Sequence, residues 1–74
     1  MHKKIIIDLQ DPVEYQKWHM KGSTNIPYNE LLYNYRKYLN KDSVYYMYCK
    51  NGKQSKRMST FLTYLGYNVI NISN

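Results

Sequence analysis

The sequence predicts an α/β fold in which helices cover both faces of an open parallel β-sheet. Apolar strand-like runs alternate along the chain with amphipathic helix-like segments, which is the order found in parallel α/β proteins. The first run, Lys4–Leu9, contains three consecutive isoleucines and is typical of a parallel strand buried on both faces. With 74 residues, 43% of them hydrophobic, the chain has room for one domain, residues 1–74.

A short helix is expected directly after the first strand. Asp11 provides an N-cap, Pro12 suits the first helical position, and Glu14 places an acid in the first turn. The segment 21–23, Lys-Gly-Ser, ends this helix soon after Trp18.

The remaining elements continue the alternation of strands and helices. We expect a brief strand at 24–27, a helix from about 29 to 39, a strand at 43–48, a helix from about 55 to 65, and a last strand at 67–72. The run 43–48 is the strongest strand candidate because valine and tyrosine favour strands. Gly66 is the expected stop of the last helix.

Cysteine and histidine usage excludes several kinds of site. A single cysteine cannot form an internal disulfide, nor a zinc site built on two thiolates. His2 and His19 lack the paired spacing of a metal motif, so neither a metal nor another cofactor is expected.

Hydropathy predicts a cytoplasmic protein without a membrane interaction. The apolar run 5–7 after Lys3 and Lys4 is too short for a signal peptide. No stretch approaches the roughly 20 apolar residues of a membrane span. In the cytoplasm a lone thiol stays reduced and reactive.

The net charge of +6 suits an anionic partner, although AT-rich codon usage alone could produce it. Aromatic rings and cations interleave here, as on nucleic-acid-binding surfaces, in Tyr33, Tyr35, Arg36, Lys37 and Tyr38. Tyrosines at helical spacing more often belong to the core, so we do not expect nucleic-acid binding as the main function.

Cys49 is the candidate nucleophile. It follows a predicted strand and precedes a loop that leads into a helix, the position at which open α/β sheets bind ligands. The loop N–H groups, the helix N-terminus and a tight curl at Gly52 favour an anion there. Nearby cations should favour the thiolate further, and they are Lys50, Lys53, Lys56 and Arg57.

Three blocks of the chain resemble the rhodanese family, in the order and spacing of that family. The first is Ile6–Leu9 with Glu14-Tyr15, the second is His19–Ser23 with Asn25–Pro27, and the third is Tyr46–Ser55 followed by Leu62, Leu65–Tyr67 and Val69. The resemblance extends from about residue 4 to residue 71. It implies a small rhodanese-like sheet that is minimal and truncated at both ends, since the chain stops at Asn74 before the family's final helix.

The resemblance implies a sulfurtransferase that carries sulfane sulfur as a persulfide on Cys49. The donor would be a small anion such as thiosulfate, and the acceptor cyanide, a thiol or a protein. The substrate would be held by the active-site loop, residues Lys50, Asn51, Gly52, Lys53, Gln54 and Ser55. Lys50 and Lys53 would attract the anion, and Ser55 would cap the helix.

Three positions depart from the family pattern, and those at Gln10 and at Trp18, which replaces the usual glycine before His19, are expected to concern packing more than chemistry. Gln54 stands where arginine is frequent in the family, and Gln10 stands where many members have arginine. Asp8 is expected to hold loop backbone, and His19 to make a structural hydrogen bond rather than to act as a base.

Two other functions compete with catalysis by Cys49. A phosphatase of the C-x5-R type requires arginine six positions after the cysteine, where Ser55 stands, and this argues against that activity. The alternative that stays open is a non-catalytic rhodanese-like binding module, because a trimmed scaffold positions a site poorly. Exposed sheet edges would also allow a homodimer.

Overall fold

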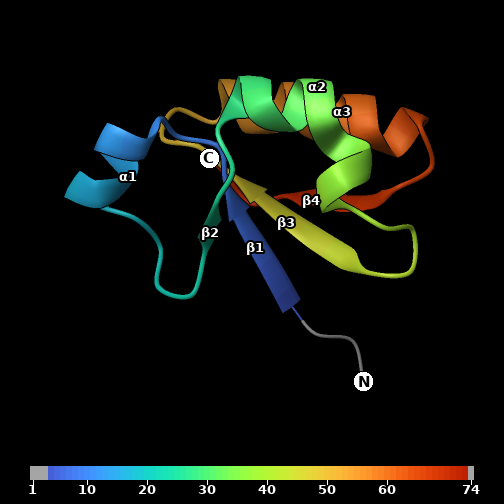
Figure 1. Ribbon diagram of the computed structural model, residues 1–74, viewed down its shortest axis with the longest axis horizontal. Coiled ribbons are helices and arrows are strands. Elements are labelled where there is room, and N and C mark those ends of the chain that lie inside the picture. Colours follow the sequence, from blue (N-terminus) through green and yellow to red (C-terminus); the bar gives the residue numbers. More distant parts are fainter. Residues whose placement is uncertain (1–3, 74) are drawn as a thin grey trace.

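The computed structural model describes residues 4–73, and strands alternate with helices through all of them (Figure 1). The strands are Lys4–Asp8 (β1), Thr24–Asn25 (β2), Val44–Tyr48 (β3) and Asn68–Asn71 (β4), and the helices are Pro12–Lys17 (α1), Tyr28–Tyr38 (α2) and Lys53–Tyr64 (α3). Each expected element is present, and its ends lie within about two residues of the expected positions, the usual uncertainty of helix and strand boundaries.

The sheet has the strand order β2-β1-β3-β4, and every neighbouring pair is parallel. β1 and β3 are the central strands, with Ile7 opposite Met47 and Asp8 opposite Tyr48. Because parallel strands end at the same edge, the loops that follow β1 and β3 lie next to each other. This is the edge at which open α/β sheets bind ligands.

The main core lies between the sheet and the two longer helices. α2 and α3 lie over the same face of the sheet (Figure 1). Ile7, Tyr45 and Met47 point toward them and are buried, and Met58 and Leu62 of α3 are fully buried against that face. This packing fixes the start of α3 relative to the end of β3.

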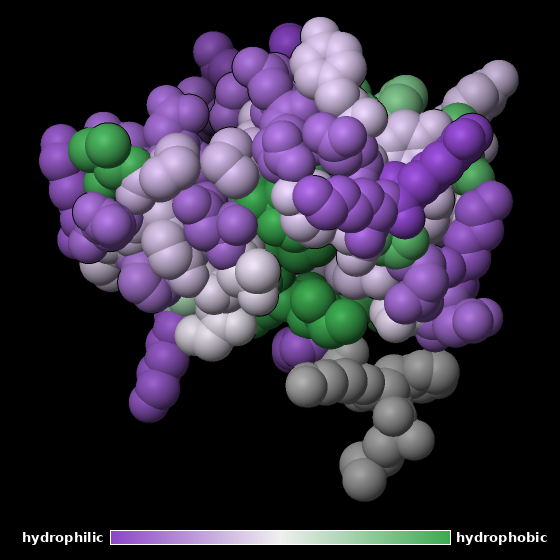
Figure 2. All heavy atoms as spheres, in the orientation of Figure 1, coloured by the Kyte–Doolittle hydropathy of each residue, from purple (hydrophilic) through white to green (hydrophobic). Residues whose placement is uncertain are grey.

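The opposite face of the sheet is covered less completely by the described residues. Ile6 and Tyr46 on this face are half-buried, and Ile70 is 46% exposed. α1 has no buried residue. The segment after α1 covers part of this face through Trp18, whose ring centroid lies 6.0 Å from that of Tyr48. Apolar atoms reach the surface below the two long helices (Figure 2). The expectation that β1 is buried on both faces is therefore wrong for its first half.

α3 ends just before Gly66, which confirms the prediction that this glycine stops the helix. Gly66 has a φ of 96°, a left-handed conformation that glycine adopts without strain. Its N–H donates to the carbonyl of Thr63, and the N–H of Tyr67 donates to that of Leu62. The chain then turns back into β4. None of the helices in residues 4–73 has the length and apolar character needed to cross a membrane.

Candidate active site

The loop after β3 turns the chain sharply into α3. Cys49 follows the last residue of β3, and Gly52, with a φ of 79°, is the N-cap of α3. Ser55 was expected to be the cap, and this is a correction. The helix begins two residues earlier, and the Ser55 hydroxyl donates to the carbonyl of Gly52 at 3.2 Å inside the first turn. Glycine is the residue that permits this curl.

The sulfur of Cys49 lies within reach of a backbone donor in the first turn of α3. The N–H of Ser55 donates to Cys49 Sγ at 3.1 Å, and the thiol contacts Asn51 Oδ1 at 3.7 Å. Asn51 Oδ1 also accepts the N–H of Lys53 at 3.0 Å, which holds the loop closed. A backbone donor at a helix N-terminus favours negative charge on the sulfur.

Ser73, near the end of the chain, holds the backbone of Cys49. The N–H of Cys49 donates to Ser73 Oγ at 2.7 Å, and Ser73 Oγ donates to the carbonyl of Cys49 at 2.9 Å. Sequence reasoning missed this residue because it lies 24 positions from Cys49, beyond the last predicted strand. The signal available was the parallel order of β3 and β4, which brings both strand ends to one edge.

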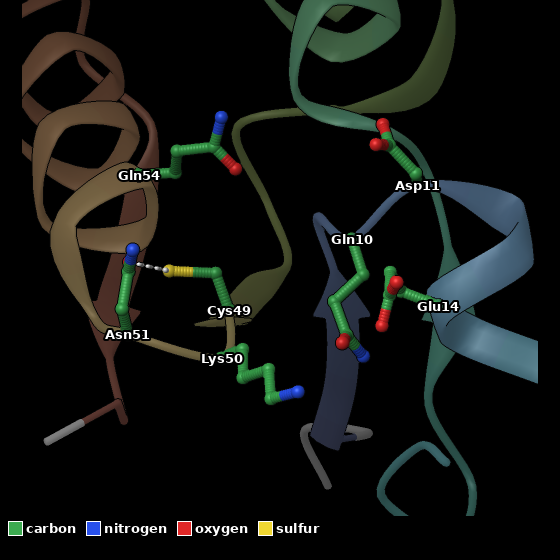
Figure 3. A pocket seen from close by; sticks show the side chains of 7 residues that line it. All are labelled: Gln10, Asp11, Glu14, Cys49, Lys50, Asn51 and Gln54. Carbon is green, nitrogen blue, oxygen red and sulfur yellow. Dashed lines mark hydrogen bonds between the residues drawn. The ribbon is translucent and has the colours of Figure 1, made fainter. Parts of the chain in front are cut away.

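A cavity of about 300 Å³ opens above Cys49. It is lined by Gln10, Asp11, Glu14, Cys49, Lys50, Asn51 and Gln54 (Figure 3). Cys49 itself is 3% exposed, so it lies at the bottom of the cavity. One wall comes from the loop after β3 and the first turn of α3, and the other from the loop after β1 and the first turn of α1.

The β1 wall is held by a buried carboxylate. Asp8 is fully buried and accepts the N–H of Gln10 and the Nε2 of Gln10, each at 2.9 Å. Asn25 Nδ2 donates to the carbonyl oxygens of Asp8 and Gln10. The expected role of Asp8, to hold loop backbone, is confirmed.

His19 lies outside the cavity lining. Its Nδ1 lies 2.8 Å from the carbonyl oxygen of Tyr15, and its ring stacks on the Tyr15 ring with centroids 3.8 Å apart. The expected structural hydrogen bond is confirmed.

The cations are not gathered around the sulfur as expected. Lys50 lines the cavity, whereas Lys53, Lys56 and Arg57 line a separate surface hollow with Phe61. In a helix, positions three and four apart share one face, and this period could have predicted that α3 carries these three charges to one side.

The structure also places each residue of the predicted active-site loop. Lys50, Asn51 and Gln54 line the cavity, Ser55 contacts the sulfur through its N–H, and Gly52 forms the turn. The facing wall contains two acidic residues, Asp11 and Glu14, that the sequence analysis does not predict as part of the site.

The comparisons with known proteins identify the family and agree with the fold. The family model of the rhodanese-like domain matches residues 1–74. The chain belongs to the rhodanese-like family. A search of curated proteins gives no match for this rhodanese-like domain.

Several solved structures resemble this rhodanese-like domain. A rhodanese-related protein from Thermoplasma volcanium is 28% identical with a TM-score of 0.86, and the match covers 96% of this chain and 70% of that one. A structure described as rhodanese with anions from E. coli is 30% identical with a TM-score of 0.81, and the match covers 95% of this chain and 85% of that one. The CoADR-RHD protein of Bacillus anthracis is 30% identical with a TM-score of 0.84, covering 93% of this chain and 12% of that one.

Proposed function

We propose that this domain is a sulfurtransferase that carries a sulfane sulfur as a persulfide on Cys49. The observation that supports this most is the position of Cys49 Sγ at the bottom of an open cavity, 3.1 Å from the N–H of Ser55. A nucleophilic cysteine needs hydrogen-bond donors at its sulfur and access to substrate, and the N–H of Ser55 and the cavity support both requirements.

The reaction takes place in two displacements. The Cys49 thiolate attacks the outer sulfur of the donor, the donor's sulfur–sulfur bond breaks, and the remainder leaves with the electron pair, as sulfite when the donor is thiosulfate. An acceptor thiolate or cyanide then attacks the outer sulfur of the persulfide and restores the Cys49 thiolate. The N–H groups of the loop, with that of Ser55 nearest, stabilise the anionic sulfur at each stage.

A non-catalytic binding module is the second candidate, and one observation favours it. Cys49 packs within the main hydrophobic cluster, as an inert structural cysteine does. The hydrogen bond from Ser55 N–H and the cavity above the sulfur favour carriage of sulfur instead, because a purely structural thiol needs neither.

Mass spectrometry of the intact protein distinguishes the two candidates. The protein is treated with thiosulfate and, separately, with a low-molecular-weight persulfide, beside a Cys49→Ser control. We expect a gain of one sulfur on the wild type with at least one donor, its removal by cyanide, and no gain on the control. If neither donor adds sulfur to folded protein whose Cys49 still reacts with an alkylating reagent, the binding module becomes the better account.

A further inference from the structure

The cavity above Cys49 has opposite polarity at its two walls. On the side of the sulfur, the N–H of Ser55 and the N-terminus of α3 favour negative charge. The facing wall contributes the carboxyl groups of Asp11 and Glu14, both from the start of α1 (Figure 3). A bound molecule therefore meets hydrogen-bond donors at the sulfur and acidic groups opposite.

Neighbouring cations do little to neutralise this acidic wall. Glu14 forms an ion pair with Lys17 at 3.7 Å, but both side chains are substantially exposed, and such pairs are weak. Within residues 4–73, Asp11 has no ion pair, and its side chain makes no capping hydrogen bond to α1. Lys50 is the single cation in the lining of the cavity, against two carboxyl groups.

The other polar groups of the lining add no positive charge. The amide nitrogen of Gln10 is already used by Asp8 and by the carbonyl of Trp18. Gln54 is neutral and lies across the cavity from Asp11 (Figure 3). A dianion such as thiosulfate would thus find one cation and two acidic groups around it.

The size of the cavity allows a small organic molecule to bind above Cys49. Its volume of about 300 Å³ lies at the lower end of the range for small-molecule sites, roughly 300 to 1,000 Å³. A small aminothiol persulfide and an inorganic anion such as thiosulfate both fit this volume, so the charge of the walls, rather than the size of the cavity, distinguishes them.

We propose that the donor for Cys49 is a low-molecular-weight aminothiol persulfide, a molecule with a neutral hydropersulfide sulfur at one end and an ammonium group at the other. The sulfur end meets the N–H of Ser55, and the ammonium group meets Asp11 and Glu14. These two acids are specificity-determining residues that favour this donor over thiosulfate. The inference rests on the proposed function, sulfur carriage by Cys49.

The transfer balances without an added oxidant. The Cys49 thiolate attacks the terminal sulfur of the donor, a new sulfur–sulfur bond forms on Cys49, and the donor's own sulfur–sulfur bond breaks. The aminothiol leaves as a thiolate and takes a proton from water or from the incoming hydropersulfide. The persulfide then resides on Cys49 for the acceptor.

The first test compares two donors that differ in charge, cysteamine persulfide and 3-mercaptopropionate persulfide, with thiosulfate as a third. Sulfur loading on Cys49 is followed over time by intact mass. An exposed charge pair changes a binding constant by up to about fivefold, so the two acids together predict a preference of roughly tenfold for the cationic donor. Equal rates for the two persulfides on the wild type would overturn the inference.

Variants assign the preference to the acidic wall. Asp11→Asn and Glu14→Gln keep the shape of each side chain, and asparagine remains a good N-cap, so α1 should persist. Each substitution should reduce the ratio of the loading rates of the cationic and the anionic persulfide about threefold. Each should also speed the loading of Cys49 by thiosulfate. Asp42→Asn is the matched control, because it removes the same charge from an exposed turn outside the cavity lining. If Asp42→Asn narrows the preference as much, the net charge of the protein is responsible and the inference is wrong.

A second test is independent of sulfur transfer. Cys49 is alkylated with 2-bromoethylammonium, bromoacetamide or bromoacetate, and each rate is divided by that of free cysteine. The inference predicts that the relative rate is highest for the cationic reagent, intermediate for the neutral one and lowest for the anionic one. These differences in rate should become smaller in Asp11→Asn and Glu14→Gln. Loss of sulfur loading with this order intact would refute the proposed function but not the charge of the cavity. Loading without the order would refute the inference alone.

Discussion

The loops after β1 and β3 face each other across one cavity, but they are held in different ways. The loop after β1 is fixed by side chains, with the buried Asp8 carboxylate accepting two hydrogen bonds from Gln10. The loop after β3 is fixed from a distance, because the hydroxyl of Ser73, 24 residues along the chain, bonds both the N–H and the carbonyl of Cys49. The first loop is therefore held by its own buried carboxylate, whereas the second depends on the segment that follows β4 and keeps its thiol at the cavity.

The largest effect is expected when the support of the β1 loop is removed. Asp8→Ala removes the acceptor of the buried Gln10 N–H and one of the two acceptors of Gln10 Nε2, which keeps only the carbonyl of Trp18. Each unsatisfied buried donor costs about 1–3 kcal/mol, so we expect a loss of about 3 kcal/mol or more in the free energy of unfolding, measured by urea denaturation. Asp8→Asn retains one acceptor oxygen and should lose less than half as much; equal losses would show that the hydrogen bonds are not responsible.

Removal of the clamp on the β3 loop, by which we mean the two hydrogen bonds between Ser73 and the backbone of Cys49, should cost less stability and should slow sulfur loading. Ser73→Ala removes the hydroxyl that binds both the N–H and the carbonyl of Cys49. We expect a loss of about 1–2 kcal/mol in the free energy of unfolding, and slower sulfur loading of Cys49 because the sulfur is positioned less well. Ser43→Ala, whose hydroxyl lies outside the clamp, is the control. Unchanged loading in folded Ser73→Ala would remove Ser73 from the positioning of the site.

Two serines of α3 give the smallest and most closely matched comparison. Ser55 Oγ donates to the carbonyl of Gly52, whereas the buried Ser59 Oγ has no hydrogen-bond partner among the described residues. Ser59→Ala should therefore raise the free energy of unfolding by up to about 1 kcal/mol, and Ser55→Ala should lower it by about 1 kcal/mol. Thermal melts of both variants against the wild type check this, and destabilisation by Ser59→Ala would contradict the absence of a partner.

Local sequence signals predicted the helices, the strands and the role of Asp8 in holding the loop after β1. These features depend on interactions between residues that lie close together in the sequence. The β-branched run predicted β1, the Asp11-Pro12 pair predicted the start of α1, and Gly66 predicted the end of α3. The position of Cys49 after a strand, with the resemblance to a known family, predicted the loop that contains it.

Long-range features of the site could not be derived in the same way. Contact between Ser73 and Cys49, and between the two walls of the cavity, depends on the strand order β2-β1-β3-β4, which no local pattern specifies. The helical period predicts that Lys53, Lys56 and Arg57 share one face of α3, and nearness to Cys49 along the chain does not bring these three side chains to the cavity.

The most direct test of the central claim follows the backbone amides of both loops by NMR while Cys49 gains and loses a sulfur. The account predicts that loading with a persulfide shifts the amide signal of Ser55, that cyanide returns it to its starting position, and that the Gln10 amide held by Asp8 stays nearly constant. A loaded protein in which the Ser55 amide does not shift would contradict the claim that the β3 loop backbone holds the transferred sulfur.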